Sequence, residues 1–245
     1  MKKKYLFLLP LLLMPLTACD LSNLVNKDDD DDDSAEASEP GAGEKLSFDK
    51  EEVINKLKTY GQTTGFDISA TVKSSTNESE GESNSSIEVA MKENMVWLIS
   101  DDGSYAGVEL NKNTVTAFTS EDGVEFETSE LGQDELNGKT PEEFFDDYME
   151  TLTSWFYFAE QYKILGLTKV KDFTFVGRSA SEYAYHMSYG GMSATYKTYI
   201  DNELGITLYW FGEAVSPEEG TDSSEFKVTS FLSGSQVNKP NIHQH

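Results

Sequence analysis

The chain has 245 residues, with 44 Asp and Glu against 19 Lys and Arg and a formal net charge of −25. A surface this acidic repels phosphate backbones and anionic lipid headgroups, which argues against nucleic-acid binding and against a polybasic membrane patch. The single cysteine excludes an internal disulfide, a CxxC redox pair and a zinc site built from several cysteines.

The first 18 residues have the parts of a secretion signal. Lys2, Lys3 and Lys4 supply positive charge that stays on the cytoplasmic side, and residues 5–16 are almost all apolar. Such a run is too short to remain as a spanning helix, which needs ~20 residues. We therefore predict a signal peptide over residues 1–18.

The sequence "LTAC" places Cys19 directly after this segment. Leucine, two small residues and cysteine resemble the lipobox of bacterial lipoproteins, a family in which the cysteine is acylated and the chain is cut just before it. The resemblance implies a membrane anchor on Cys19, held firmly if two or three acyl chains such as palmitate are attached. The alternative is an ordinary secretion signal cleaved near Ala18, with an incidental cysteine.

Residues 19–44 are predicted to form the lipidated cysteine and a disordered acidic tether. Asp28–Asp33 repel one another, and the segment has too few apolar residues to fold. The aspartate run resembles a surface-export signal, whereas Asp20 resembles an inner-membrane retention signal. We expect a bacterial envelope protein, at the outer membrane or cell surface rather than the inner membrane. Six consecutive aspartates lack the ligand spacing of a calcium loop.

Residues 45–245 are long enough for one domain with a core and a short C-terminal tail. Asp49 and Glu52 have capping-box spacing, which predicts a helix over about 50–60 that Gly61 ends. From Phe66 apolar and polar residues alternate, and short strands follow up to residue 129, separated by "EN", "DDG", "NKN" and "EDG". Such short turns predict an antiparallel meander.

A second helix is predicted over residues 141–166, with Thr140 as its cap and Pro141 in its first turn. At 100° per residue, its aromatic side chains fall on one broad face. Thr153 falls on the polar face, and Tyr157 is the one aromatic residue that strays onto it. Such a wide aromatic face requires a large apolar partner surface.

More strands follow this helix, including the hairpin "YIDNELGITL" over residues 199–208. The prediction is therefore an α+β domain with about eleven antiparallel strands and two helices. This order of elements over residues 46–234 resembles the LolA-like lipoprotein-carrier fold. The resemblance implies an unclosed half-barrel, a curled sheet whose concave face is covered by the long aromatic helix, with a hollow that accommodates acyl chains.

Two features depart from the soluble carriers of that family. Those carriers lack a lipid anchor, and they have an internal arginine. The one arginine here, Arg178, lies beside a predicted turn. We therefore expect an anchored relative that keeps the hollow and does not shuttle between membranes.

Large apolar residues of the helix and of the strands are the candidates for a cavity lining. They are Trp97, Tyr148, Leu152, Trp155, Phe156, Tyr185 and Trp210. The alternative is that they simply fill the core between helix and sheet. Sequence alone leaves both readings open.

The sequence contains none of the motifs HExxH, GxSxG, the P-loop or GxGxxG. His186 is a lone strand histidine, His243 and His245 lie in the tail, and pairs such as Asp101 and Asp102 are expected by chance in so acidic a chain. We therefore predict no enzyme activity, no cofactor and no metal. The predicted function is an envelope-anchored lipoprotein that binds a lipid or other hydrophobic ligand. The alternative is a surface module that binds a protein or glycan.

Overall fold

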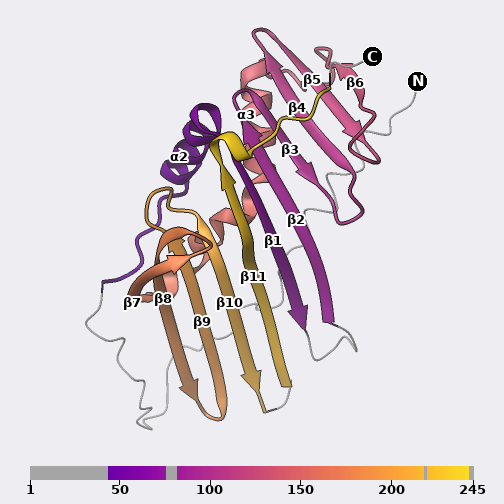
Figure 1. Ribbon diagram of the computed structural model, residues 1–245. Helices are drawn as coiled ribbons and strands as arrows, with labels where there is room; N and C mark the ends of the chain where they lie inside the picture. The colour runs from indigo at the N-terminus through magenta and orange to yellow at the C-terminus, as the bar shows by residue number, and fades with distance from the viewer. Residues whose placement is uncertain (1–43, 76–81, 218–219, 243–245) are drawn as a thin grey trace.

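The computed structural model describes residues 44–75, 82–217 and 220–242. They contain one antiparallel sheet of 11 strands in the order β6-β5-β4-β3-β2-β1-β11-β10-β9-β8-β7, together with a few helical segments (Figure 1). The sheet does not close on itself, so the predicted α+β class and unclosed antiparallel sheet are confirmed. The predicted signal peptide, Cys19, most of the tether, His243 and His245 lie outside the described residues.

Two meanders make up this sheet. The strands are β1 (Phe66–Ser75), β2 (Glu82–Lys92), β3 (Met95–Ile99), β4 (Tyr105–Asn111), β5 (Thr114–Ser120), β6 (Glu127–Glu130), β7 (Thr168–Phe175), β8 (Arg178–Tyr189), β9 (Met192–Asp201), β10 (Thr207–Ser216) and β11 (Gly220–Ser233). Each strand from β1 to β6 pairs with the next along the chain, and so does each from β7 to β11. Pairing of β1 with β11 joins the two meanders into one continuous sheet.

Helix α2 (Lys50–Thr63) begins where the sequence predicts, because Asp49 accepts a hydrogen bond of 3.1 Å from the Glu52 amide. The predicted end at Gly61 is wrong. Gly61 remains helical and lies against the sheet, where a Cβ atom would come within 2.5 Å of Met91 Sδ. The chain instead reverses at Gly65, whose φ is +85°.

Helix α3 (Pro141–Leu152) also begins as predicted, with a full capping box. The Glu143 amide donates to Thr140 Oγ1 over 3.2 Å, and the Thr140 amide donates to Glu143 Oε2 over 2.8 Å. The prediction of one long aromatic helix up to residue 166 is wrong. The α-helix ends at Leu152, and a 3₁₀ helix, η2 (Ser154–Leu165), follows.

Thr153 lies at this break. Its hydroxyl donates to the Met149 carbonyl over 2.7 Å and lies 2.6 Å from the Tyr157 hydroxyl. Both residues are buried, although the sequence placed them on the polar side. A 3₁₀ helix turns about 120° per residue, and the helical pattern assumed 100°, so the break rotates Tyr157 into the core.

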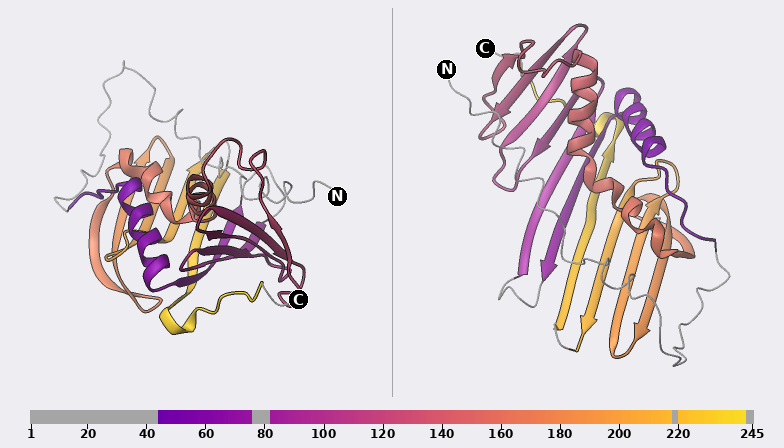
Figure 2. Two further views of the ribbon diagram at one scale, coloured as in Figure 1. Left: turned by 90° about the horizontal axis from the view of Figure 1, so that it is seen from above. Right: turned by 180° about the vertical axis from the view of Figure 1, so that it is seen from behind.

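The helical segments lie on one face of the sheet, which we call the inner face (Figure 2). Helix α3 contacts β3, β4 and β5, whereas η2 contacts β10. Strands β1, β2 and β8–β11 continue well past the helices in the same view. Within the described ranges, no helix is both long and apolar enough to cross a bilayer.

The opposite, outer face is covered over β2–β5 by residues 234–242, which we call the C-terminal strap (Figure 1). It begins with the short 3₁₀ turn η3 (Gly234–Gln236). Its side chains Val237 and Ile242 are buried in a second apolar cluster with Ala90, Met95, Trp97 and Phe118. The predicted tail is therefore part of the fold as far as Ile242.

Candidate functional site

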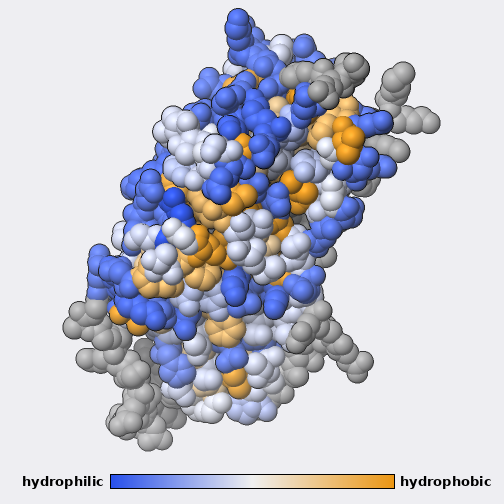
Figure 3. All heavy atoms as spheres, viewed as in Figure 1, coloured by the Kyte–Doolittle hydropathy of each residue, from blue (hydrophilic) through white to orange (hydrophobic). Residues whose placement is uncertain are grey.

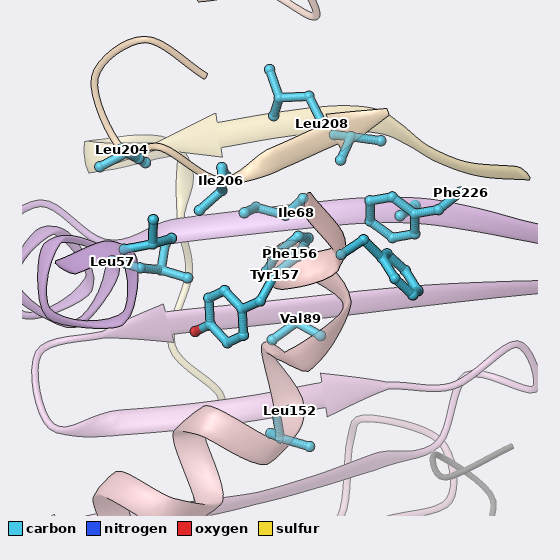
Figure 4. Close-up of a cluster of buried hydrophobic side chains, with 14 of the residues drawn as sticks. Leu57, Ile68, Val89, Leu152, Phe156, Tyr157, Leu204, Ile206, Leu208 and Phe226 are labelled. Atoms are coloured by element: carbon cyan, nitrogen blue, oxygen red, sulfur yellow. The ribbon is translucent and has the colours of Figure 1, made fainter. Parts of the chain in front are cut away.

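The space between η2 and the sheet holds an aromatic cluster centred on Phe226 of β11. Trp155 stacks on Phe226 with ring centroids 6.4 Å apart and an interplanar angle of 7°. The rings of Phe156 and Phe158 lie 6.0 Å and 5.6 Å from the same ring. Figure 4 shows the side chains of the helical segment, such as Phe156 and Tyr157, directed toward those of the sheet.

A second group of rings continues this cluster along the inner face. Tyr196 and Trp210 stack at 5.5 Å with an angle of 18°, and Tyr185 lies 6.4 Å from Tyr196. The two stacked rings lie over Gly212, where a Cβ atom would come within 2.7 Å of Trp210 Cζ2. Glycine at this position therefore lets the rings lie close to the sheet.

Six of the seven predicted cavity residues come together in this inner cluster. Leu152, Phe156 and Trp210 are buried in it, and Tyr148, Trp155 and Tyr185 pack against it partly exposed. Trp97 does not join them, because it belongs to the cluster on the outer face. The first four residues of β3 are all buried, so the strand shows no alternation that would tell its two faces apart.

Next to η2, buried side chains of the helical segment and of the sheet pack against one another. The described residues instead form an open groove of about 690 Å³ between α2 and the hairpin that joins β9 to β10. Its lining is mostly polar, with Asp49, Glu52, Asn55 and Glu203 among the residues. This groove does not match the predicted apolar hollow.

The inner face past η2 differs from the packed region. Pairing registers of β8–β11 place a set of mostly small or apolar residues there, which we call the inner strip. It consists of Tyr185, Met187, Met192, Ala194, Gly212, Ala214, Ser216, Asp222 and Ser224. Asp222 is the one charged member. The outer face of the same strands carries Lys197, Glu213 and Glu225.

Aromatic rings also line part of the outer face over β7, β9 and β10. Phe173 lies 4.8 Å from Tyr199, and Tyr199 lies 4.6 Å from Tyr209. Burial raises the pKa of Tyr209, and its hydrogen bond to Glu225 raises it further. Figure 3 shows hydrophobic side chains gathered across the middle of this face.

A buried ion pair that the sequence did not predict joins β8 to the hairpin between β9 and β10. Arg178 binds Asp201 through two hydrogen bonds, Nε to Oδ2 at 2.7 Å and Nη2 to Oδ1 at 3.0 Å, and its guanidinium lies 4.6 Å from the centre of the Phe231 ring. Asp201 also accepts from the Glu203 and Leu204 amides. The hairpin motif "DNELG" could have indicated the carboxylate, whereas its pairing with the lone arginine depends on the fold. The role is structural.

The polar residues considered for catalysis hold the fold in other ways. His186 Nδ1 lies 3.0 Å from Thr195 Oγ1 on the outer face. Asp101 accepts from the Ser86 amide over 2.9 Å, and Asp102 accepts from the Ser104 amide over 3.0 Å. Hydrogen bonds from the Ser104 side chain and then from its amide hold the pKa of Asp102 below its usual range. No three His, Cys, Asp or Glu side chains within the described part of the chain converge on a metal site.

No protein-family model and no curated protein matches the sequence. Among solved structures, PNGF-II aligns with 72% of this chain at 9% identity with a TM-score of 0.26, and the chain spans only 29% of PNGF-II. A DUF1329 family protein from Desulfovibrio piger is 8% identical over 79% of this chain and 95% of its own, with a TM-score of 0.29. A LolA superfamily protein from Nitrosomonas europaea is 7% identical over 81% of this chain and 99% of its own, with a TM-score of 0.27. At TM-scores this low, neither the details of these folds nor the functions of these proteins can be assigned to this chain.

Proposed function

We propose that this protein is a non-enzymatic, lipid-anchored protein of the bacterial envelope that binds a hydrophobic ligand along the inner strip. The supporting observation is the difference between the two faces of β8–β11. The inner strip stays uncharged apart from Asp222 where the strands extend beyond the helices, whereas the outer face of the same strands carries lysine and glutamate.

Sheet faces that meet water normally carry charged residues on many strands, whereas Asp222 is the one charged residue of the inner strip, which favours a covering partner. Met187 and Met192 flank the small residues Ala194 and Ala214 on this surface. Methionine side chains adapt to irregular apolar surfaces. Ala194 is buried at the edge of the packed core, whereas Ala214 is partly exposed. The ring of Tyr196 borders the strip and lies 6.4 Å from that of Tyr185 within it, so the strip is continuous with the packed aromatic cluster.

Each methylene group of an acyl chain that is buried on this surface would contribute about 0.8 kcal/mol to the free energy of binding. Native mass spectrometry of the domain, purified from cells without detergent, tests the proposal. We expect masses above that of the chain that correspond to hydrophobic molecules and disappear after extraction with organic solvent.

Substitutions on β10 provide a matched pair for this experiment. Ala214 belongs to the inner strip, and its neighbour Val215 faces the opposite side; both are partly buried. Ala214→Phe should reduce the bound hydrophobic mass, and Val215→Phe should leave it unchanged. Equal retention by both variants would contradict binding at the inner strip, and a chain free of hydrophobic ligand would contradict the function itself.

The anchor is a separate part of the proposal, and it rests on the sequence around Cys19. Cys19→Ser should move the protein from the membrane pellet to the soluble fraction, because the acyl chains attach to the cysteine sulfur. Continued sedimentation with membranes would contradict acylation of Cys19.

The alternative is a surface module that binds an envelope protein or glycan. One observation favours it: the row of partly exposed rings Phe173, Tyr199 and Tyr209 on the outer face. Ring faces of this kind bind apolar side chains or the flat faces of sugars. Loss of binding to an envelope fraction on Phe173→Ser, with the hydrophobic ligand retained, would favour this alternative.

A further inference from the structure

The outer face of β2–β5 differs from the rest of that face because it is covered. Met95, Trp97 and Phe118 form its apolar floor, and Trp97 and Phe118 are 2% and 1% exposed. Gly107 lies beneath the Phe118 ring, where a Cβ atom would clash with Phe118 and with the Val96 carbonyl oxygen. The floor is therefore shaped to hold a large ring close to the sheet.

What covers this floor is the C-terminal strap. Val237 and Ile242, five residues apart, insert into the cluster and are 1% and 2% exposed. These are two apolar anchors of the kind by which an extended peptide binds a groove. Without them, Trp97 and Phe118 would form an exposed apolar patch.

Lysines on both sides fix the strap between these anchors. Lys92 of β2 donates to the strap carbonyls of Val237 over 2.8 Å and Gly234 over 3.2 Å. In return, Lys239 of the strap lies 3.0 Å from Glu93 and 3.7 Å from the buried Glu109. The groove thus offers the carboxylates of Glu93 and Glu109 to a lysine of the bound segment. It also offers the ammonium group of Lys92 to the backbone carbonyls of that segment.

The hinge of the strap is one short turn. Gly234 has a φ of +64°, its amide donates to the Gly65 carbonyl over 3.4 Å, and the Val237 amide donates to the Gly234 carbonyl over 3.3 Å. The strap is held mainly by side-chain contacts rather than by a strand ladder. Segments attached in this way open at a lower free energy than the sheet itself.

We propose that the outer face of β2–β5 is a peptide-docking groove that fits the C-terminal strap of a second copy of this chain. The partner is an extended segment with aliphatic anchors five residues apart and a lysine two residues after the first, which is the pattern of Val237, Lys239 and Ile242. In the structure the chain's own strap fills the groove. Exchange of straps joins two copies with the contacts already present in one.

The chain's own strap competes with this exchange. A segment tied by a short linker has an effective concentration in the millimolar range, so the unmodified chain favours its own groove at ordinary protein concentrations. Shortening the hinge removes this competition, since deletion of Ser235 and Gln236 shortens the reach by up to ~7 Å. Two chains with short hinges can still fill each other's grooves.

Light scattering after size-exclusion chromatography of the full chain tests this proposal. The deletion of Ser235 and Gln236 should double the molar mass relative to the parent chain. The same deletion combined with Val237→Asp and Ile242→Asp should restore the single-chain mass, because the anchors can no longer enter any groove. A hinge-shortened chain that keeps the single-chain mass at all concentrations would overturn the proposal.

Binding of a separate strap peptide tests the same groove in chains whose hinge is intact. A fluorescently labelled peptide of residues 234–242 is titrated against the full chain and against Lys239→Glu, which weakens the chain's own strap at its exposed edge. Binding should be roughly tenfold tighter to the variant, since its groove opens more often. The proposal is wrong if neither chain binds the peptide, or if a peptide with both anchors changed to Asp binds equally well.

Discussion

Strands β2–β5 and β8–β11 belong to the same sheet, yet their surroundings differ. The first region is covered on both faces, by α3 inside and by the C-terminal strap outside. Among the described residues, η2 covers the second region near one end, and the strands continue past the helix (Figure 2). The first region is thus covered by other parts of the chain on both faces, whereas the inner strip of the second region carries one charge, Asp222, and is the surface to which we assign the proposed ligand.

The division follows from the break at Thr153. A continuous α-helix would run straight, whereas the change to η2 lets one segment cover β3–β5 and the next cover β10. Substitutions in the two regions should therefore lower the free energy of unfolding by different amounts.

The largest loss of stability is expected at the ion pair between Arg178 and Asp201, which joins β8 to the end of β9 in the second region. Asp201 is 1% exposed, so Arg178→Met leaves a buried carboxylate without its bidentate partner. We expect the free energy of unfolding to fall by about 3–5 kcal/mol in urea denaturation. Glu203→Gln is the control: its carboxylate also binds Arg178 but is 67% exposed, and it should cost less than about 1 kcal/mol. Equal effects of the two would contradict the structural role of Asp201.

Substitution of one glycine in each region compares how tightly the two regions are packed. In Gly107→Ala the new Cβ would come within 2.5 Å of the Val96 carbonyl oxygen, which the sheet holds in place. In Gly212→Ala it would come within 2.7 Å of the Trp210 ring, which is a side chain rather than backbone. We expect losses of about 2–3 kcal/mol for Gly107→Ala and about 1 kcal/mol for Gly212→Ala. Thermal unfolding of both variants measures the difference, and the reverse order would show that the second region is the more rigid.

The smallest effect concerns Asp67 on β1, the strand between the two regions. Burial raises its pKa to about 6, and Glu88 contributes to the rise. A raised acid pKa means that the folded state binds the proton more tightly than the unfolded chain, whose carboxyl has an ordinary pKa near 3.8. Stability from this group is therefore greatest below pH 4 and is lost as the pH rises to about 6.

Asp67→Asn should remove this loss. We expect the variant to gain about 1 kcal/mol over the parent at pH 7.5, after allowance for solvent screening, and to gain little at pH 4. Urea denaturation at the two pH values measures the gain. A gain of the same size at both would indicate a cause other than ionisation.

Sequence reasoning succeeded where local signals are strong. Thr140 and Pro141 indicated the start of α3, Asp49 indicated the start of α2, and alternation from Phe66 indicated the first strand. Turns rich in Asp, Asn and Gly separated the strands of the first meander. Strand number and antiparallel arrangement followed from these signals.

The errors arose where the fold overrides a local pattern. Trp97 was assigned to the inner side because the strap that covers its outer face is more than 130 residues away in the sequence. Tyr157 was assigned to the polar side because a constant helical pitch was assumed through Thr153. Gly61 was taken as a helix end, although close packing on Met91 explains it.

The candidate site was predictable only in part. Tyr148, Trp155 and Phe156 were predicted from their helical spacing and Trp210 from strand alternation, and they do meet in one cluster. The inner strip itself was missed, because Gly212, Ala214 and Ala194 are small and carry no chemical signal. Only the pairing registers of β8–β11 bring them together.

Quenching of tryptophan fluorescence by a brominated acyl glyceride tests most directly whether hydrophobic ligands bind to the inner face of the second region. Bromine quenches at contact range, and Trp155 borders the inner cluster whereas Trp97 lies beneath the strap on the other face. Trp210 also lies on the inner face, over Gly212 of the inner strip. We predict saturable quenching that Trp155→Phe combined with Trp210→Phe largely removes and Trp97→Phe leaves intact. Quenching that survives the double substitution but is lost in Trp97→Phe, or none at all, would contradict binding at the inner face.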